Sequence, residues 1–175
     1  CIPVGNGTDA LFIILKMLGI GSGDEVITTA LSWISTSESI SQTGARPVFI
    51  DINENSYTID ESLIESTITA STKAIMPVHI YGQAAEMTAS QKRCNKDKLY
   101  LREDGAQAHF AEWQGQKVGT FGHAGTFSFF PSKNLGAYGD GGAIITNNDE
   151  LAIKCRMFAN HGALKRHHHK FEGIN

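Results

Sequence analysis

The stretch that decides how this chain folds is Ser128-Phe129-Phe130-Pro131-Ser132-Lys133-Asn134. It continues an apolar run at residues 126–129, which is typical of a buried strand, and then presents one lysine. Lysine side chains nearly always lie on the solvated surface, so a lysine in this position is uncommon. The aromatic residues before Lys133 and the glycine-rich run at 139–142 favour a functional interpretation of it.

A lysine within reach of a carbonyl-bearing cofactor forms a Schiff base, and pyridoxal phosphate (PLP) is the cofactor that uses such a lysine most often. PLP also requires a carboxylate beside its pyridine nitrogen and amides and hydroxyls around its phosphate. Its ring requires a flat apolar partner. The sequence offers a candidate for each of these requirements.

The candidate carboxylate is Asp104, which closes a short strand predicted to begin with residues 99–101. In open α/β sheets, ligands bind at the carboxyl ends of the strands, so an acid at this place points toward a site. Asp104 and Gly105 also suit a surface turn, which is the competing interpretation when they are taken alone.

A candidate phosphate site lies near the start of the chain, in Val4-Gly5-Asn6-Gly7-Thr8-Asp9. This loop runs into an apolar helix predicted at residues 11–18, with Thr8 as its expected N-cap. Free N–H groups and the helix dipole make such a junction an anion site, and Thr8 adds a hydroxyl. Plain helix capping explains the same residues, so this motif carries weight only beside the others.

Short apolar runs alternate with helical patterns along the whole chain. The predicted strands cover residues 26–27, 48–50, 74–76, 99–101, 126–129 and 143–145. The predicted helices cover residues 11–18, 34–42, 60–68, 85–95 and 149–159. This alternation predicts an α/β fold with a mostly parallel sheet and helices on both faces.

These motifs occur together and in one order, and through them the chain resembles the DegT/DnrJ/EryC1/StrS family of PLP-dependent sugar aminotransferases. The motifs are Gly-Thr-Asp-Ala-Leu at 7–11, Thr-Thr-Ala-Leu-Ser-Trp-Ile-Ser-Thr at 28–36, Pro-Val-His-Ile-Tyr-Gly-Gln at 77–83, Glu-Asp-Gly-Ala-Gln-Ala at 103–108, Phe-Ser-Phe-Phe-Pro-Ser-Lys-Asn-Leu-Gly at 127–136 and Gly-Asp-Gly-Gly at 139–142. The resemblance implies the aspartate-aminotransferase fold and covers essentially the whole chain. Residues 1–175 would be the large PLP-binding domain of a fold-type I aminotransferase, as a fragment without an N-terminal segment and without the small C-terminal domain.

The resemblance also implies a role for each motif residue near the ring. Lys133 would hold the cofactor as a Schiff base and, once displaced by the amino donor, would act as general acid and base. Asp104 would pair with the pyridine nitrogen, and Gln107 would face the ring or its hydroxyl. Gln107 could equally be an amide that stabilises its loop.

The remaining implied roles concern the phosphate and the face of the ring. Thr8, the backbone at Asp9, and Ser128 would hold the phosphate, and Trp33 would stack on the ring. Asn175 would reach the phosphate of a neighbouring subunit, since a homodimer is the expected assembly. Trp33 could instead be a core residue, and the Ser128 hydroxyl could instead bond only the backbone.

The histidines receive no catalytic or metal-binding role. His79 follows an apolar strand and fits a hydrogen-bonded structural histidine, and His109 is equally ambiguous. The run at 167–169 is three adjacent histidines, which cannot all face one ion without an irregular backbone. It is interpreted as a loop, and no metal is predicted.

Several positions depart from the pattern of the resembling family, including Ser90 and Gln91, which interrupt the apolar stripe of a helix. Arg102 falls in a strand position that is usually apolar, and Gly105 follows Asp104 where alanine is common. A buried unpaired arginine is costly, so either Arg102 is solvated or the local packing has changed. Gly105 is expected to loosen the backbone that aims Asp104.

The composition fits a globular protein of one domain, with 175 residues of which 41% are hydrophobic. A net charge of −3 gives no reason to expect nucleic acid or an anionic membrane as partner, and the sequence shows no long apolar run or signal peptide. Cys1, Cys94 and Cys155 are too few, and odd in number, for a disulfide framework. They favour a reducing compartment, and the expected location is cytoplasmic.

The activity that the resemblance implies is transfer of an amino group, with glutamate as expected donor, to a nucleotide-linked keto-sugar in polysaccharide or glycosylated-metabolite biosynthesis. Two alternatives stay open. The sugar dehydratases of the family have histidine in place of the Schiff-base lysine, so Lys133 disfavours them. A non-catalytic PLP-binding or regulatory protein of the same fold is disfavoured by the presence of both Lys133 and Asp104.

Overall fold

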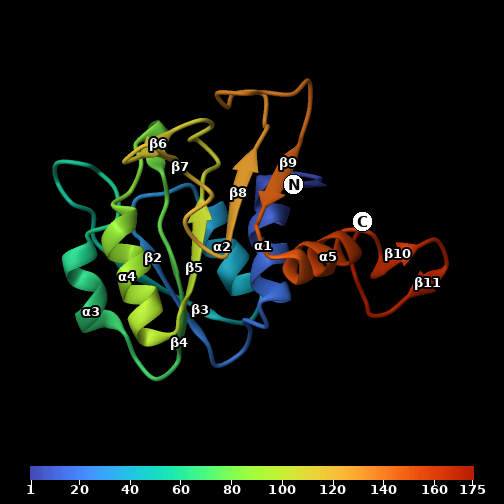
Figure 1. Cartoon of the computed structure of the whole chain (residues 1–175), viewed down its shortest axis with the longest axis horizontal. Helices are drawn as coiled ribbons and strands as arrows, with labels where there is room; N and C mark the ends of the chain where they lie inside the picture. Colours follow the sequence, from blue (N-terminus) through green and yellow to red (C-terminus); the bar gives the residue numbers. More distant parts are fainter.

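Seven strands form one sheet in the computed structural model, which describes residues 1–175 (Figure 1). Across the sheet the strands are β1 (Ile2–Val4), β9 (Gly142–Ile145), β8 (Ala124–Ser128), β5 (Tyr100–Asp104), β4 (Thr72–Met76), β2 (Glu25–Thr29) and β3 (Arg46–Ile50). The five strands from β8 to β3 pair in parallel, β9 is antiparallel to β8, and β1 is antiparallel to β9. The mostly parallel sheet expected from the sequence is confirmed.

Helices cover both faces of the sheet, as the alternating pattern predicts (Figure 1). They are α1 (Gly7–Met17), α2 (Ser35–Gln42), α3 (Ile64–Thr67), α4 (Met87–Asp97) and α5 (Asp149–Phe158), with short 3₁₀ helices η1 (Glu61–Leu63) and η2 (Ile80–Gly82). On one face α1 packs against α2, α5 and the sheet, and α3 and α4 pack on the other. The helix expected at residues 60–68 is divided between η1 and α3.

Helix α1 begins earlier than expected, and its N-cap is Asn6 rather than Thr8. The Asn6 side chain accepts a hydrogen bond from the Asp9 amide at 2.8 Å, which is the usual bond of an asparagine N-cap. The assignment of Thr8 as N-cap is therefore wrong, because Thr8 lies inside the first turn. The expected burial of the helix is confirmed by Ala10, Leu11, Ile13, Ile14 and Leu15, all of which are buried.

Five short strands were not predicted. They are β1 at the sheet edge and two separate hairpins, formed by β6 (Glu112–Trp113) with β7 (Gln116–Lys117) and by β10 (Ala163–Lys165) with β11 (His168–His169). None is longer than three residues, which is too short to show a period. The prediction of a loop at the histidine run is wrong, because His168 and His169 form β11.

Arg102 is fully buried at 0% exposure on β5, which excludes the solvated alternative. Its Nη1 contacts Met76 Sδ, while Nε and Nη2 have no hydrogen-bond partner. Burial lowers the pKa of the guanidinium to about 10, although the nearby charge of Asp104 opposes this shift. Arg102 is therefore a buried cation with two unpartnered nitrogen atoms and no direct ion pair, a costly arrangement.

Both the backbone amide and the backbone carbonyl of Gly105 are hydrogen-bonded. Its amide donates to the Thr126 carbonyl at 2.9 Å, and its carbonyl accepts from the Ala108 amide at 2.9 Å. A Cβ at this position would lie 3.0 Å from Cε1 of Phe127, so alanine would require the ring to shift. The expected loosening by Gly105 is thus countered by two backbone bonds.

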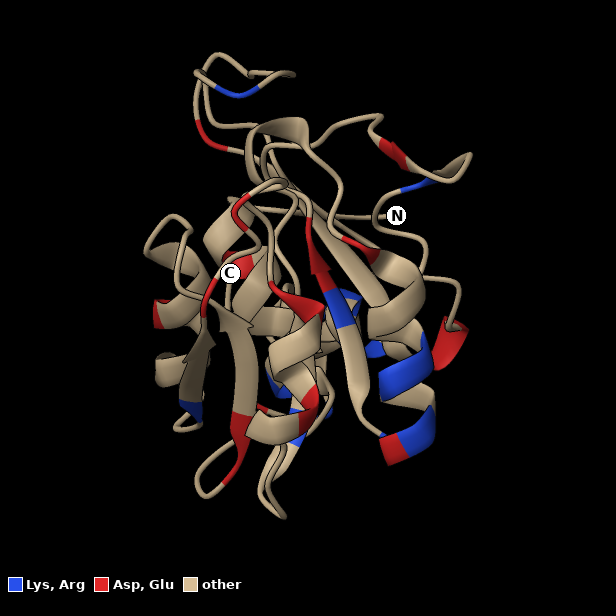
Figure 2. Ribbon diagram, turned by 90° about the vertical axis from the view of Figure 1, so that its left-hand side faces the viewer, with Lys and Arg blue, Asp and Glu red and all other residues tan.

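The charged residues are interspersed over the molecule rather than collected in one block of either sign (Figure 2). None of the helices combines the length and the apolar character needed to cross a bilayer. No group of three His, Cys, Asp or Glu side chains converges so that it could hold a metal ion. Burial raises the pKa of both Cys94 and Cys155 to about 12, so these thiols are chemically inert.

Replacing Arg102 with methionine should raise the free energy of unfolding of the full-length protein by about 1–4 kcal/mol, because the change removes a buried charge with two unpartnered nitrogen atoms and keeps an unbranched side chain. Urea unfolding followed by circular dichroism measures the effect. The control Arg156→Met alters an exposed arginine that donates to the Cys1 carbonyl, and it should change stability by less than about 0.5 kcal/mol. An Arg102→Met protein less stable than the wild type would contradict the prediction.

Candidate active site

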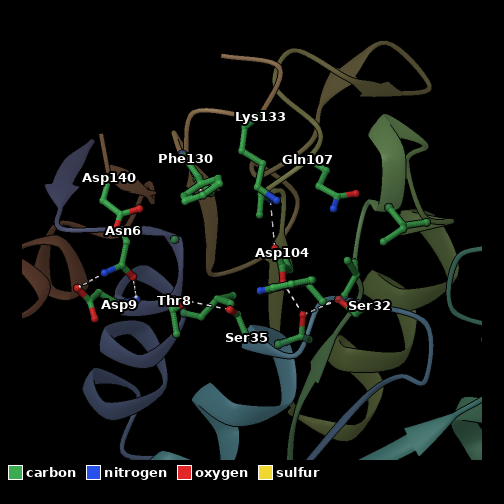
Figure 3. Close-up of a pocket in the computed structure, with 18 of the residues that line it drawn as sticks. Asn6, Thr8, Asp9, Ser32, Ser35, Asp104, Gln107, Phe130, Lys133 and Asp140 are labelled. Carbon is green, nitrogen blue, oxygen red and sulfur yellow. Dashed lines mark hydrogen bonds between the residues drawn. The ribbon is translucent and has the colours of Figure 1, made fainter. Parts of the chain in front are cut away.

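A cavity of about 620 Å³ opens at the carboxyl ends of the central strands, beside the N-terminus of α1 (Figure 3). Seven of the eight residues predicted for the site line it, namely Thr8, Asp9, Trp33, Asp104, Gln107, Ser128 and Lys133. Asn175 is the exception, since it is exposed at the end of the chain and outside the cavity lining. The fold thus brings together segments that are more than a hundred residues apart in sequence.

Asp104 is 3% exposed, and its carboxylate is held from two sides. Thr36 Oγ1 donates to Oδ2 at 2.8 Å, and the Ala106 amide donates to Oδ1 at 3.1 Å. The Thr36 hydroxyl is itself within 2.6 Å of the Ser32 hydroxyl. These contacts fix the orientation of an acid that faces the cavity, so the surface-turn interpretation of Asp104 is wrong.

The N-terminus of α1 meets the end of β8 at a close contact. A Cβ on Gly7 would lie 2.7 Å from the Ser128 Cβ, so only glycine allows the helix to approach this closely. The amides of Gly7 and Thr8 are among the first four of the helix, which have no acceptor inside it. Together with the Ser128 and Thr8 hydroxyls they form a pocket suited to an anion.

Two of the residues in this pocket already make internal bonds. The Asp9 amide donates to Asn6 Oδ1, so a phosphate bound by that amide would replace the N-cap bond. The Thr8 hydroxyl donates to Ser35 Oγ at 2.7 Å. Burial raises the pKa of the Asp9 carboxyl, the hydrogen bond from Asn6 opposes this rise, and the negative charge of Asp140 adds to it.

Lys133 is the only lysine among the residues that line the cavity. It is half-buried, and its side chain points from the loop after β8 toward Asp104 (Figure 3). The loop is folded tightly, because the Lys133 amide donates to the Phe130 carbonyl at 2.8 Å and the Ala137 amide donates to the Phe129 carbonyl at 2.7 Å. Lys133 and Asp104 line the same cavity.

The structure also decides between the alternatives for the other residues. Trp33 is 69% exposed at the cavity, so its interpretation as a core residue is wrong. The Ser128 hydroxyl does bond the backbone, accepting from the Phe130 amide at 3.3 Å, which leaves its hydrogen for a ligand. Gln107 Oε1 accepts from the Tyr81 amide at 2.9 Å, so Gln107 stabilises a loop while its Nε2 remains a donor.

Sequence reasoning missed several polar residues of this cavity. Asn6, Ser35 and Thr36 were quoted within motifs but given no role, and Asp140 was seen only as part of a glycine-rich run. An asparagine directly before a helix is a usable N-cap signal. The bond from Thr36 to Asp104 spans 68 residues, so no local pattern could have shown it.

The cavity fits PLP by the chemistry of its own residues. It offers one amine at Lys133, a fixed carboxylate at Asp104, and an anion pocket at Gly7, Thr8 and Ser128. These are the three groups that PLP needs for its aldehyde, its pyridine nitrogen and its phosphate. The fold and the site therefore identify this chain as a PLP-binding domain.

The chain belongs to the DegT/DnrJ/EryC1/StrS aminotransferase family, whose profile matches residues 1–175. A pleiotropic regulatory protein of Geobacillus stearothermophilus is 51% identical over 99% of this chain and 47% of its own length. UDP-2-acetamido-2-deoxy-3-oxo-D-glucuronate aminotransferase of Pseudomonas aeruginosa is 46% identical over 100% of this chain and 49% of its own length. The chain thus spans about half the length of the curated relatives that it matches.

Solved structures agree with this assignment. DesV of S. venezuelae, solved in complex with a ketimine intermediate, is 42% identical with a TM-score of 0.97, over 99% of this chain and 47% of that chain. NtdA of Bacillus subtilis, solved with bound cofactor PMP, is 38% identical with a TM-score of 0.92, over 99% of this chain and 40% of that chain. The expected fold is confirmed over nearly the whole chain.

Replacing Thr36 with valine should lower the free energy of unfolding of the full-length protein by about 1.5–3 kcal/mol, the range for a hydrogen bond to a charged group. The matched control is Thr28→Val, because the Thr28 hydroxyl is equally buried and donates at 2.8 Å to the neutral Met76 carbonyl. That change should cost only about 0.5–1.5 kcal/mol. Equal losses in urea unfolding would show that the Thr36 bond does not hold a charged carboxylate.

Proposed function

We propose that this chain is the cofactor-binding part of a PLP-dependent aminotransferase that acts on a nucleotide-linked keto-sugar with glutamate as amino donor. The observation that carries the proposal is the shared cavity of Lys133 and Asp104 next to the anion pocket of α1. The proposed products would enter polysaccharides or glycosylated metabolites.

Each residue of the cavity has a definite task in this proposal. PLP, when bound, supplies an electron sink that stabilises negative charge on the substrate carbon. Lys133 binds the cofactor through its amine and, when free, holds and returns a proton at Nζ. Asp104 keeps a carboxylate against the pyridine edge, and its bonds from Thr36 and Ala106 preorganise it.

The other contacts orient the cofactor. The Gly7 and Thr8 amides and the Ser128 hydroxyl would bind the phosphate, and the Nε2 of Gln107 would donate to the ring hydroxyl. Trp33 would cover the face of the ring, which its present exposure allows. Contacts at the phosphate and at the pyridine nitrogen would fix the orientation of the ring relative to Lys133.

The substrate class rests on what the relatives act on. The Pseudomonas aeruginosa relative bears the name of a UDP-sugar aminotransferase. A dTDP-3-amino-3,4,6-trideoxy-alpha-D-glucose transaminase of Streptomyces venezuelae is 42% identical over 99% of this chain. These names share a nucleotide-linked sugar and differ in the sugar and in the nucleotide, so the proposal stops at the substrate class.

The proposed assembly is a homodimer in which Asn175 reaches the phosphate of the neighbouring subunit. Large apolar side chains are exposed at the cavity, among them Trp33 and Phe130. Covering such side chains would favour association. A cytoplasmic location is proposed because all three cysteines are free thiols.

A second candidate is a regulatory protein that binds PLP without turnover. It is favoured by the name of the Geobacillus stearothermophilus relative, a pleiotropic regulatory protein. The two candidates predict the same cofactor and differ only in whether the amino group moves. A sugar dehydratase is disfavoured because position 133 is lysine rather than histidine.

Borohydride reduction of the full-length protein with PLP should attach the cofactor to the peptide that contains Lys133, as mapped by mass spectrometry. The label should disappear in Lys133→Arg, because arginine forms no Schiff base with the cofactor. The matched control Lys117→Arg changes an exposed lysine that pairs with Glu112, and it should leave the label in place. A label at another lysine, or none on folded wild-type protein, would overturn the cofactor assignment.

Incubating the full-length protein with keto-sugar nucleotides and glutamate should produce 2-oxoglutarate, which a regulatory protein would not form. Asp104→Asn should lower kcat/KM about 100-fold or more, the loss typical of removing one preorganised electrostatic partner. Bound PLP without any 2-oxoglutarate across a panel of sugars and donors would favour the regulatory candidate.

A further inference from the structure

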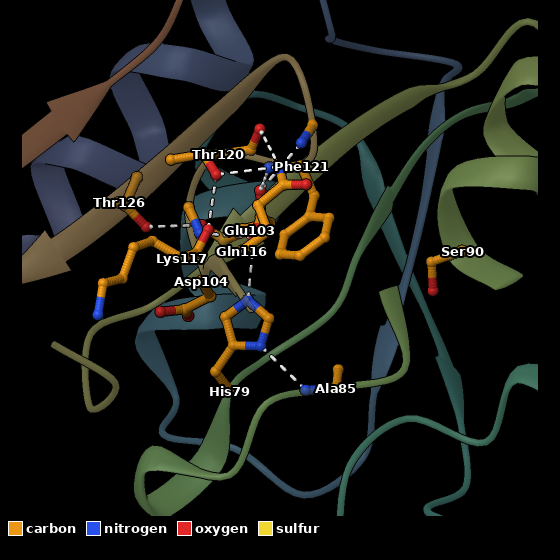
Figure 4. Close-up of polar contacts among 12 residues, drawn as sticks. His79, Ala85, Ser90, Glu103, Asp104, Gln116, Lys117, Thr120, Phe121 and Thr126 are labelled. Atoms are coloured by element: carbon orange, nitrogen blue, oxygen red, sulfur yellow. Dashed lines mark hydrogen bonds and ion pairs between the residues drawn. The ribbon is translucent and has the colours of Figure 1, made fainter. Parts of the chain in front are cut away.

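A buried polar network lies beneath the cavity, on the opposite face of β5 (Figure 4). Its centre is Glu103, which is 0% exposed and does not line the cavity. Because neighbouring residues of a strand point to opposite faces, Glu103 lies directly behind Asp104. No role for Glu103 follows from the cofactor chemistry alone.

The Glu103 carboxylate accepts hydrogen bonds from backbone amides of the loop that leads into β8. Gly119 donates to Oε2 at 2.6 Å, while Phe121 and Gly122 donate to Oε1 at 2.8 and 2.9 Å. Hydrogen bonds to an ionised carboxylate are about twice as strong as neutral ones. This loop is therefore tied to β5 by one side chain.

His79, which is also 0% exposed, completes the network from the segment after β4. Its Nδ1 accepts from the Ala85 amide at 3.0 Å, which places the ring proton on Nε2. Nε2 then donates to Glu103 Oε2 at 3.2 Å. The His79 amide donates to the Asp104 carbonyl at 3.0 Å, so the same residue also holds the end of β5.

Each of the three joined segments continues into the cavity. The segment after β4 supplies Val78 and Ile80 to the lining, β5 supplies Asp104, and the loop leads through β8 to Ser128 and Lys133. The spacing between these segments sets the distance between the carboxylate, the hydroxyl and the amine of the site. One buried acid thus joins β5 to the segment that follows β4 and to the segment that precedes β8.

We infer that Glu103 and His79 are positioning residues for the cofactor cavity, holding Asp104 and the strand that leads to Lys133 in register without touching the ligand. This inference rests on the proposed function, since the ligand is PLP. A positioning role differs from a purely structural one in a testable way. It requires the cavity to change shape when the network is broken, even though the protein still folds.

Glu103→Gln tests the inference, because glutamine has the same shape but its NH₂ group faces a backbone amide that donates. The matched control is Glu25→Gln, since Glu25 is 7% exposed and accepts from Thr69 at 2.6 Å at the amino end of β2. In the full-length protein, Glu103→Gln should bind PLP at least about tenfold more weakly, a factor in line with losing one hydrogen bond to a charged group. Glu25→Gln should bind PLP within about twofold of the wild type, because Glu25 lies at the amino end of β2, whereas the cavity opens at the carboxyl ends of the strands. PLP affinity of Glu103→Gln within about twofold of the wild type would overturn the inference.

A measurement without cofactor separates this inference from the proposed function. In the PLP-free protein, Glu103→Gln should speed amide hydrogen exchange at residues 104–107, 128–130 and 132–133 as well as at 119–122, because the cavity wall is no longer hydrogen-bonded to Glu103 as in the wild type. Faster exchange confined to 119–122 would mean a local structural role and would overturn the inference. A wild-type protein that binds no PLP would instead reject the proposed function, and the exchange result would still decide the inference.

His79 gives a second route if Glu103→Gln does not fold. His79→Leu removes the donor to Glu103, whereas His79→Gln keeps an amide donor of similar reach. PLP affinity should fall at least about tenfold in His79→Leu and recover in part in His79→Gln. Equal affinities of His79→Leu and the wild type would overturn the inference.

Discussion

The structure depends on how the end of β5 is held between its neighbours. The Asp104 amide donates to the Pro77 carbonyl and its carbonyl accepts from the His79 amide, both at 3.0 Å, so the last residue of the strand is still paired with the β4 side. On the other side, β5 pairs in parallel with β8 up to Asp104 and Thr126. Because parallel strands end at the same edge, this pairing delivers Asp104 and Ser128 to one cavity.

Helix α1 supplies the other half of the site through the same packing that stabilises the core. Its buried side contacts the sheet, α2 and α5, which fixes the helix axis against the end of β8. Gly7 then allows the first turn to lie against Ser128. The direction of the free amides in the first turn of α1 is thus set by the apolar packing of the helix.

Two charged side chains in the core, Glu103 and Arg102, differ in how far hydrogen bonds compensate their burial. Glu103 is fully buried but accepts from three backbone amides and His79, so its burial is compensated. Arg102, one residue earlier, has two nitrogen atoms without any partner. The two residues point to opposite faces of the sheet, and the nearby polar groups on the Arg102 side, Thr36 and Asp104, bond each other rather than Arg102.

The sequence alone determined the fold class and most of the cavity, because local periods mark strands and helices and because Lys133 and Asp104 are chemically distinctive in their motifs. The predicted helices also match the observed ones within a few residues, except that the helix expected at 60–68 is divided between η1 and α3. Only the tertiary structure decided that Trp33 is exposed and that Arg102 is buried with two nitrogen atoms lacking a partner. The hydrogen bonds from Thr36 to Asp104 and from the 119–122 loop to Glu103 are likewise visible only in the tertiary structure. The physical reason is the same for each of these features: burial and hydrogen bonding depend on what lies across a contact from segments distant in sequence, and no local pattern of residues records that.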